Sequence, residues 1–142
     1  MTAPITRPRA PVPTEHVEQA MLFQWSQLAT GKYPELADLF AIPNAGGYTG
    51  GFRANVARVV AMKREGVRSG IPDICLPVAR GRYHALYIEL KRTNAKPSDT
   101  KPEQAEWHER LAAAGNCVVV CPGWEAARYA IEAYLTLIPT NP

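Results

Sequence analysis

Three side chains that could act together on a phosphate ester stand close to one another in this sequence. Asp73 begins the apolar run Ile74–Val78, and Glu89 and Lys91 stand two residues apart at the end of the run Ala85–Lys91. Residues at i and i+2 of a strand share one face, about 7 Å apart. If the two runs pair as a hairpin, Asp73 comes within about 5 Å of the polar pair.

Two carboxylates beside one ammonium predict a site for a hard divalent cation. Burying like charges is unfavourable because they repel each other and lose their hydration, and a cation between them removes that cost. Carboxylate and water ligands favour Mg²⁺ or Mn²⁺. Cys75, Cys117 and Cys121 lack the spacing of zinc ligands and are interpreted as buried, reduced thiols. The alternative for Glu89 and Lys91 is an ordinary exposed ion pair.

Helices and strands of an α/β domain position these residues. Hydrophobic periodicity and capping signals predict the order α, α, β, β, α, β, α. The first helix is expected to be capped by Thr14 and to bury an apolar stripe against the core, formed by Val17, Ala20, Met21 and Leu28. A helical turn is expected near 35–40. The remaining predicted elements are a helix at 53–65 ended by Gly66, strands at 74–78 and 85–91, a helix opened by a capping box at 100–103, a buried strand at 117–121 and a helix at 124–137.

One domain is expected over residues 14–138 of the 142, between a flexible arm rich in Pro and Arg at 1–13 and a short tail at 139–142. No apolar run approaches the roughly 18 residues of a membrane span, and the arm lacks the apolar region of a signal peptide. These features, with the reduced cysteines, lead us to expect a cytoplasmic protein that does not interact with membranes.

Positive charge surrounds the predicted site. Residues 44–101 carry a net charge of +7, whereas the rest of the chain carries −4. A polyanion such as nucleic acid is the partner that this field favours, and a solvated basic face is the alternative. The candidate DNA-binding residues are Arg53, Arg58, Lys63, Arg64, Arg68 and Arg92, with the glycine-rich loop Gly46–Gly51 beside them.

Several blocks in the correct order resemble the VRR-NUC domain, the virus-type replication-repair branch of the PD-(D/E)xK nuclease superfamily. The resemblance extends from about Thr14 to Leu137, and short stand-alone members of this kind are typical of phages and prophages. Its blocks are Gly66-Val67, Gly70-Ile71-Pro72-Asp73, Tyr87-Ile88-Glu89-Leu90-Lys91, Glu103-Gln104-x-x-Trp107, Leu111 and Gly115.

The resemblance implies a restriction-endonuclease-like core, with a small mixed β-sheet flanked by helices, and a role for each matching residue. Asp73, Glu89 and the backbone carbonyl of Leu90 would bind the metal, and Lys91 would act on the attacking water. An acid from the first helix would join them, either Glu18, our first choice, or Glu15. Gln104 would orient Lys91 or contact a phosphate, unless it only caps its helix. The residues interpreted as structural or solvated are His16, His84 and His108.

The resulting hypothesis is a DNA endonuclease dependent on Mg²⁺ or Mn²⁺, without a small-molecule cofactor. The resemblance further implies a homodimer that cuts branched DNA such as four-way junctions, because two symmetric nicks need two sites related by a two-fold axis. Two alternatives remain: an accessory protein that binds nucleic acid without cutting it, and a general or restriction-like nuclease that acts on linear duplex.

Overall fold

A mixed β-sheet forms the centre of the fold. The computed structural model describes residues 8–44 and 51–140. In that part of the chain, strands pair in the order β1 (Phe40–Ala41), β2 (Ile74–Leu76), β3 (Leu86–Lys91) and β4 (Cys117–Pro122). The pairs β1–β2 and β2–β3 are antiparallel, and β4 runs parallel to β3. The predicted α/β class, with a mixed sheet flanked by helices, is confirmed.

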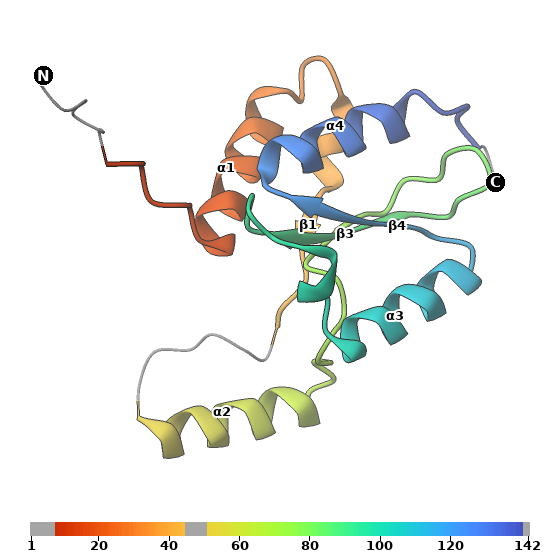
Figure 1. Ribbon diagram of the computed structural model, residues 1–142. Helices are drawn as coiled ribbons and strands as arrows, with labels where there is room; N and C mark the ends of the chain where they lie inside the picture. The colour runs from red at the N-terminus through yellow and green to blue at the C-terminus, as the bar shows by residue number, and fades with distance from the viewer. Residues whose placement is uncertain (1–7, 45–50, 141–142) are drawn as a thin grey trace, which may run out of the picture.

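Two helix layers cover the sheet. The helices α1 (Glu15–Leu28) and α4 (Trp124–Leu135) lie on one face, and α3 (Pro102–Ala113) lies on the other (Figure 1). The short 3₁₀ turn η1 (Pro34–Asp38) lies between α1 and β1, and η2 (Pro97–Asp99) lies between β3 and α3. The helix α2 (Phe52–Arg64) stands away from the sheet and its two layers (Figure 1). It is followed by Gly66, whose φ of 97° suits glycine at this predicted helix end.

Alternation along β3 separates the core from the site. Leu86, Ile88 and Leu90 are at most 1% exposed and pack between the sheet, α1 and α4. Burying a side chain of this size contributes about 1.5–3 kcal/mol. Glu89 and Lys91 therefore lie on the opposite face, toward α3, as the alternation predicted.

The buried face of α1 differs from the predicted stripe. Val17, Met21 and Leu28 are 47%, 39% and 83% exposed, whereas Glu18, Leu22 and Ser26 are buried. The two polar side chains can be buried because each has a hydrogen-bond partner within the fold. The prediction of the stripe was wrong because hydrophobicity alone does not show which polar residues will find partners.

Two strands differ from the sequence prediction, and the predicted loop lies largely outside the described residues. The sequence did not predict β1, which is only two residues long and is exposed. The strand β4 is at an edge of the sheet, where Val120 remains 44% exposed, so it is less buried than predicted. The predicted glycine-rich loop falls largely on residues 45–50, outside the described part of the chain.

Among the described helices, none combines the length and hydrophobicity needed to cross a bilayer.

Candidate active site

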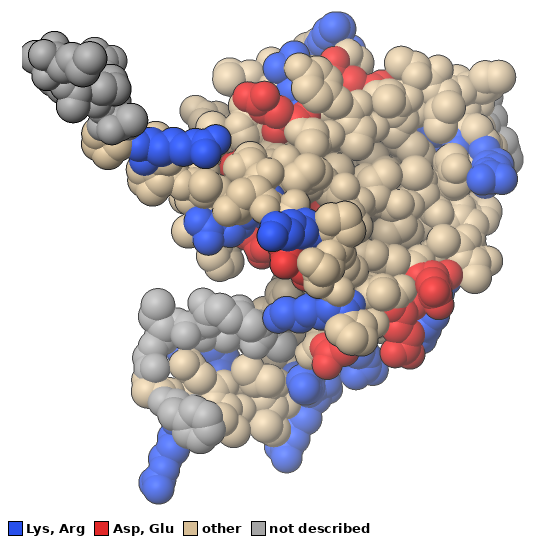
Figure 2. Space-filling view, in the orientation of Figure 1, with Lys and Arg blue, Asp and Glu red and all other residues tan. Residues whose placement is uncertain are grey.

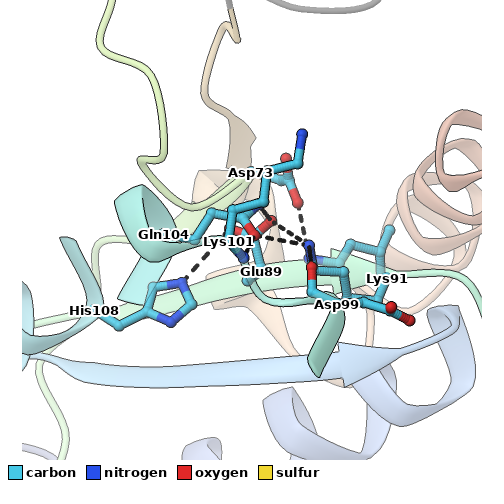
Figure 3. A network of polar contacts seen from close by, with 8 residues as sticks. Asp73, Glu89, Lys91, Asp99, Lys101, Gln104 and His108 are labelled. Carbon is cyan, nitrogen blue, oxygen red and sulfur yellow. Dashed lines mark hydrogen bonds and ion pairs between the residues drawn. The ribbon is translucent and has the colours of Figure 1, made fainter. Parts of the chain in front are cut away.

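The pairing of β2 with β3 brings the two acidic residues together. Ile74 lies opposite Ile88, so Asp73 lies opposite Glu89 one position further along the ladder. The backbone N–H of Asp73 donates to the Ile88 carbonyl at 3.0 Å. Its Oδ2 atom accepts from the Leu90 N–H at 2.8 Å. The hairpin geometry predicted for Asp73 and Glu89 is therefore present (Figure 3).

A close approach between two segments brings this corner of the sheet against α3. Gly70 has a φ of 83°, and a Cβ atom there would lie 2.7 Å from the Glu103 backbone. Only glycine accommodates both the left-handed conformation and this contact without strain. The segment that leads into Asp73 therefore runs directly beside the first turn of α3.

Gln104 connects Lys91 to Glu89 (Figure 3). Its Nε2 atom donates to Glu89 Oε1 at 2.7 Å, and its Oε1 atom accepts from Lys91 Nζ at 2.8 Å. The same Oε1 atom accepts from the Lys101 N–H at 3.0 Å, which caps α3. The capping box predicted at Thr100 and Glu103 was therefore misplaced by one residue. Lys101 is the N-cap, because the side chain at the third helical position is Gln104.

The Lys91 ammonium is held beside both carboxylates. It is buried, donates to the Asp99 carbonyl at 3.4 Å, and lies 3.8 Å from Glu89 Oε1. An ammonium has three N–H donors. The bonds to Gln104 and Asp99 use two of them, so one N–H can face water or a phosphate oxygen in the cleft.

His108 lies beside Glu89 on the same face of α3 as Gln104, one turn further along (Figure 3). Its Nε2 atom is 3.6 Å from Glu89 Oε2, and neither atom has a hydrogen-bond partner within the described residues. Burial and then Lys91 lower the pKa of His108, so this contact is not an ion pair at neutral pH. In the sequence, His108 stands four residues after Gln104, a spacing that puts both side chains on one face of a helix. Our interpretation of the histidines as structural or solvated did not use this spacing.

Both carboxyl groups hold their protons more tightly than usual. Burial, followed by the charge of Asp73, raises the pKa of Glu89 to about 8. Burial is also the main cause that raises the pKa of Asp73, against the hydrogen bond from the Leu90 N–H. The two groups therefore compete for negative charge, as expected of two carboxylates close to each other.

The two candidate acids of α1 have different surroundings. Glu18 is buried, and its Oε2 atom accepts from the Trp124 N–H in the first turn of α4 at 2.8 Å. A carboxylate at a helix N-terminus is stabilised by the backbone dipoles. Glu15, the alternate candidate, lines the same cleft as Asp73 and Glu89, and its charge contributes to raising the pKa of both. Glu18 does not line that cleft.

The cleft has a volume of about 1100 Å³ and lies between the first turn of α1, the segment after β1, and the start of α3. Figure 2 shows Lys and Arg side chains around this hollow and over α2. Of the candidate DNA-binding residues, five are exposed side chains on or after α2: Arg53, Arg58, Lys63, Arg64 and Arg68. The sixth, Arg92, is also exposed and lines the cleft, and it donates to the backbone carbonyls of Val12 and Pro13.

The donor set fits a hard divalent cation. The N–H and carbonyl of one strand residue leave on the same side, so the Leu90 carbonyl faces Asp73, as its N–H does. Within the described residues, no three His, Cys, Asp or Glu side chains gather as a metal-binding group. The chain would thus offer the Asp73 and Glu89 carboxylates and the Leu90 carbonyl, with water as the remaining ligands and Glu15 on the same cleft wall. Mg²⁺ is commonly bound through one or two carboxylates while it keeps several waters.

Comparisons with known proteins agree with this geometry. A family model of the VRR-NUC domain matches residues 48–124, which is more than half of the chain. A solved structure described as a VRR_NUC domain protein is similar with a TM-score of 0.71 and 30% sequence identity. The alignment covers 92% of this chain and 95% of that chain. Among curated proteins, no match was found. The chain therefore belongs to the VRR-NUC domain family, which implies a nuclease of the PD-(D/E)xK type with DNA as its partner.

Proposed function

We propose that this nuclease is an endonuclease that hydrolyses DNA phosphodiester bonds with Mg²⁺ or Mn²⁺ held by Asp73, Glu89 and the Leu90 carbonyl. The observation that carries the proposal is the pair of facing carboxylates, both with raised pKa, beside the buried Lys91 ammonium. Bound there, the cation would lower the pKa of a water ligand and neutralise charge that develops on the phosphate.

The side chains of the site would supply the remaining chemistry. The free N–H of Lys91 would orient the attacking water or stabilise a phosphoryl oxygen as charge develops. Gln104 would keep the ammonium in place, because its amide fixes the position of Lys91 Nζ relative to Glu89. Glu15, rather than Glu18, would provide the carboxylate from α1, because it lines the cleft.

We propose that the substrate is branched DNA such as a four-way junction, cut by a homodimer. Two features support this. The basic helix α2 projects away from the body, so it can reach a second DNA arm (Figure 1). Val56 and Val60, one turn apart on α2, are 47% and 45% exposed, which favours contact with a second copy.

One experiment tests these points together. Purified protein is incubated with labelled linear, flap and four-way-junction DNA in Mg²⁺, Mn²⁺, Ca²⁺ or EDTA. We expect junction cleavage in Mg²⁺ or Mn²⁺, and no cleavage by Asp73→Asn, Glu89→Gln or Lys91→Ala variants that remain folded. Near-normal cleavage by all three variants would refute the site. Equal rates on linear and branched DNA would refute the substrate preference only, and a band shift without cleavage would indicate the accessory role.

A further inference from the structure

Arg92 makes two hydrogen bonds to the segment that precedes α1. It follows Lys91 directly at the end of β3, and its Nη2 atom donates to the Val12 carbonyl at 2.8 Å. Its Nε atom donates to the Pro13 carbonyl at 3.2 Å. A guanidinium presents its donors in a rigid planar fork, so two bonds to successive carbonyls fix the direction of the chain as well as its position.

These bonds lie immediately before the start of α1. Thr14 follows Pro13 and caps the helix, accepting from the Val17 N–H at 3.3 Å. Glu15 is the first helical residue and stands two positions after Pro13, so about 7 Å of chain at most separates them. Glu15 itself is exposed, and the buried face of α1 begins at Glu18. The first turn therefore depends on contacts outside the core.

We propose that Arg92 is a positioning residue, which holds the start of α1 so that the Glu15 carboxylate faces Asp73 and Glu89 across the cleft. This inference rests on the proposed cation site. It assigns Arg92 a role different from the DNA contact expected from its charge. The end of β3 would then position two functional groups. Lys91 would point into the cleft directly, and Arg92 would position Glu15 through its bonds to the segment before α1.

The test compares Arg92→Gln, Glu15→Gln, the double variant and Asp73→Asn, with Arg68→Gln as the matched loss of one exposed positive charge. The first readout is Mn²⁺ affinity measured by calorimetry without DNA. The second is DNA affinity in EDTA as a function of salt concentration. Thermal unfolding checks each fold, and Arg92→Lys, which keeps the charge but not the fork, replaces Arg92→Gln if that variant does not fold.

We expect Arg92→Gln to weaken Mn²⁺ binding about tenfold, the scale typical of residues that orient metal ligands. Glu15→Gln should have a similar effect, and the double variant should bind Mn²⁺ no more weakly than Glu15→Gln alone. The salt dependence of DNA binding should stay unchanged in Arg92→Gln. In Arg68→Gln the slope should fall by about one unit, with Mn²⁺ affinity intact.

Other outcomes separate this inference from the proposed function. Unchanged Mn²⁺ affinity in Arg92→Gln, additive losses in the double variant, or a reduced salt slope would each overturn the positioning role. If Asp73→Asn weakens Mn²⁺ binding and Glu15→Gln does not, the inference fails while the cation site stands. If Asp73→Asn has no effect on Mn²⁺ affinity, the cation site itself is wrong.

Discussion

Replacing Glu89 with glutamine should stabilise the metal-free protein at alkaline pH. Burial and the charge of Asp73 raise the pKa of Glu89 from 4.5 to about 8. A carboxyl group whose pKa is raised by folding keeps its proton longer in the folded state than in the unfolded state. The free energy of unfolding therefore falls as pH rises from about 4.5 to about 8, and levels off above that range.

The size of the effect follows from the width of that range. One pKa unit corresponds to about 1.4 kcal/mol, so the loss between pH 5 and pH 9 is on the order of 3–4 kcal/mol. Glutamine has nearly the same shape and no charge. Its carbonyl can accept from Gln104 Nε2, and its amide can donate to His108 Nε2, the two atoms that face Glu89 now.

Urea unfolding in EDTA at a series of pH values measures this difference. We expect the wild-type protein and Glu89→Gln to have similar unfolding free energies at pH 5 and to diverge by pH 9, with the variant more stable. Mg²⁺ or Mn²⁺ at pH 8 should restore the stability of the wild-type protein only. Parallel pH profiles for the two proteins would show that folding does not raise the pKa of Glu89 and would refute the electrostatic argument.

Three further predictions test the surroundings of the site. Gly70→Ala should destabilise the protein by about 2 kcal/mol or more in urea unfolding, because φ is 83° and the new Cβ would meet the Glu103 backbone; an unchanged midpoint would contradict this. Glu18→Ala should lower the unfolding free energy by about 2 kcal/mol, by removing the carboxylate from the Trp124 N–H, and should leave Mn²⁺ affinity measured by calorimetry intact. A loss of Mn²⁺ affinity in that folded variant would return Glu18 to the metal site. Val60→Asp should make the protein monomeric in light scattering, with its melting temperature nearly unchanged, and a dimer that persists would place the interface elsewhere.

Alternation and motif order were sufficient to predict which side chains meet at the centre of the candidate site. The apolar residues Ile88 and Leu90 required Glu89 and Lys91 to share the opposite face, and a hairpin then required Asp73 to lie beside them. These relations depend on backbone geometry within one strand pair, which a local sequence pattern determines.

Residues whose roles depend on distant partners could not be predicted in the same way. The choice between Glu15 and Glu18 depends on where the first turn of α4 lies, because its Trp124 N–H binds the Glu18 carboxylate. Arg92 resembled its basic neighbours in sequence, and only the path of residues 12 and 13 showed what it binds. Charge and periodicity carry no information about such contacts, which form between segments far apart in the chain.

The amide of Gln104 gives the start of α3 and the ammonium of Lys91 a common anchor. Fraying of that first helical turn would release the ammonium, and withdrawal of the ammonium would weaken the turn. The folding of the first turn of α3 and the placement of the Lys91 ammonium in the site would then be coupled in a single equilibrium. A nucleic-acid strand that orders this turn on arrival would, by the same contact, prepare the enzyme to cut it.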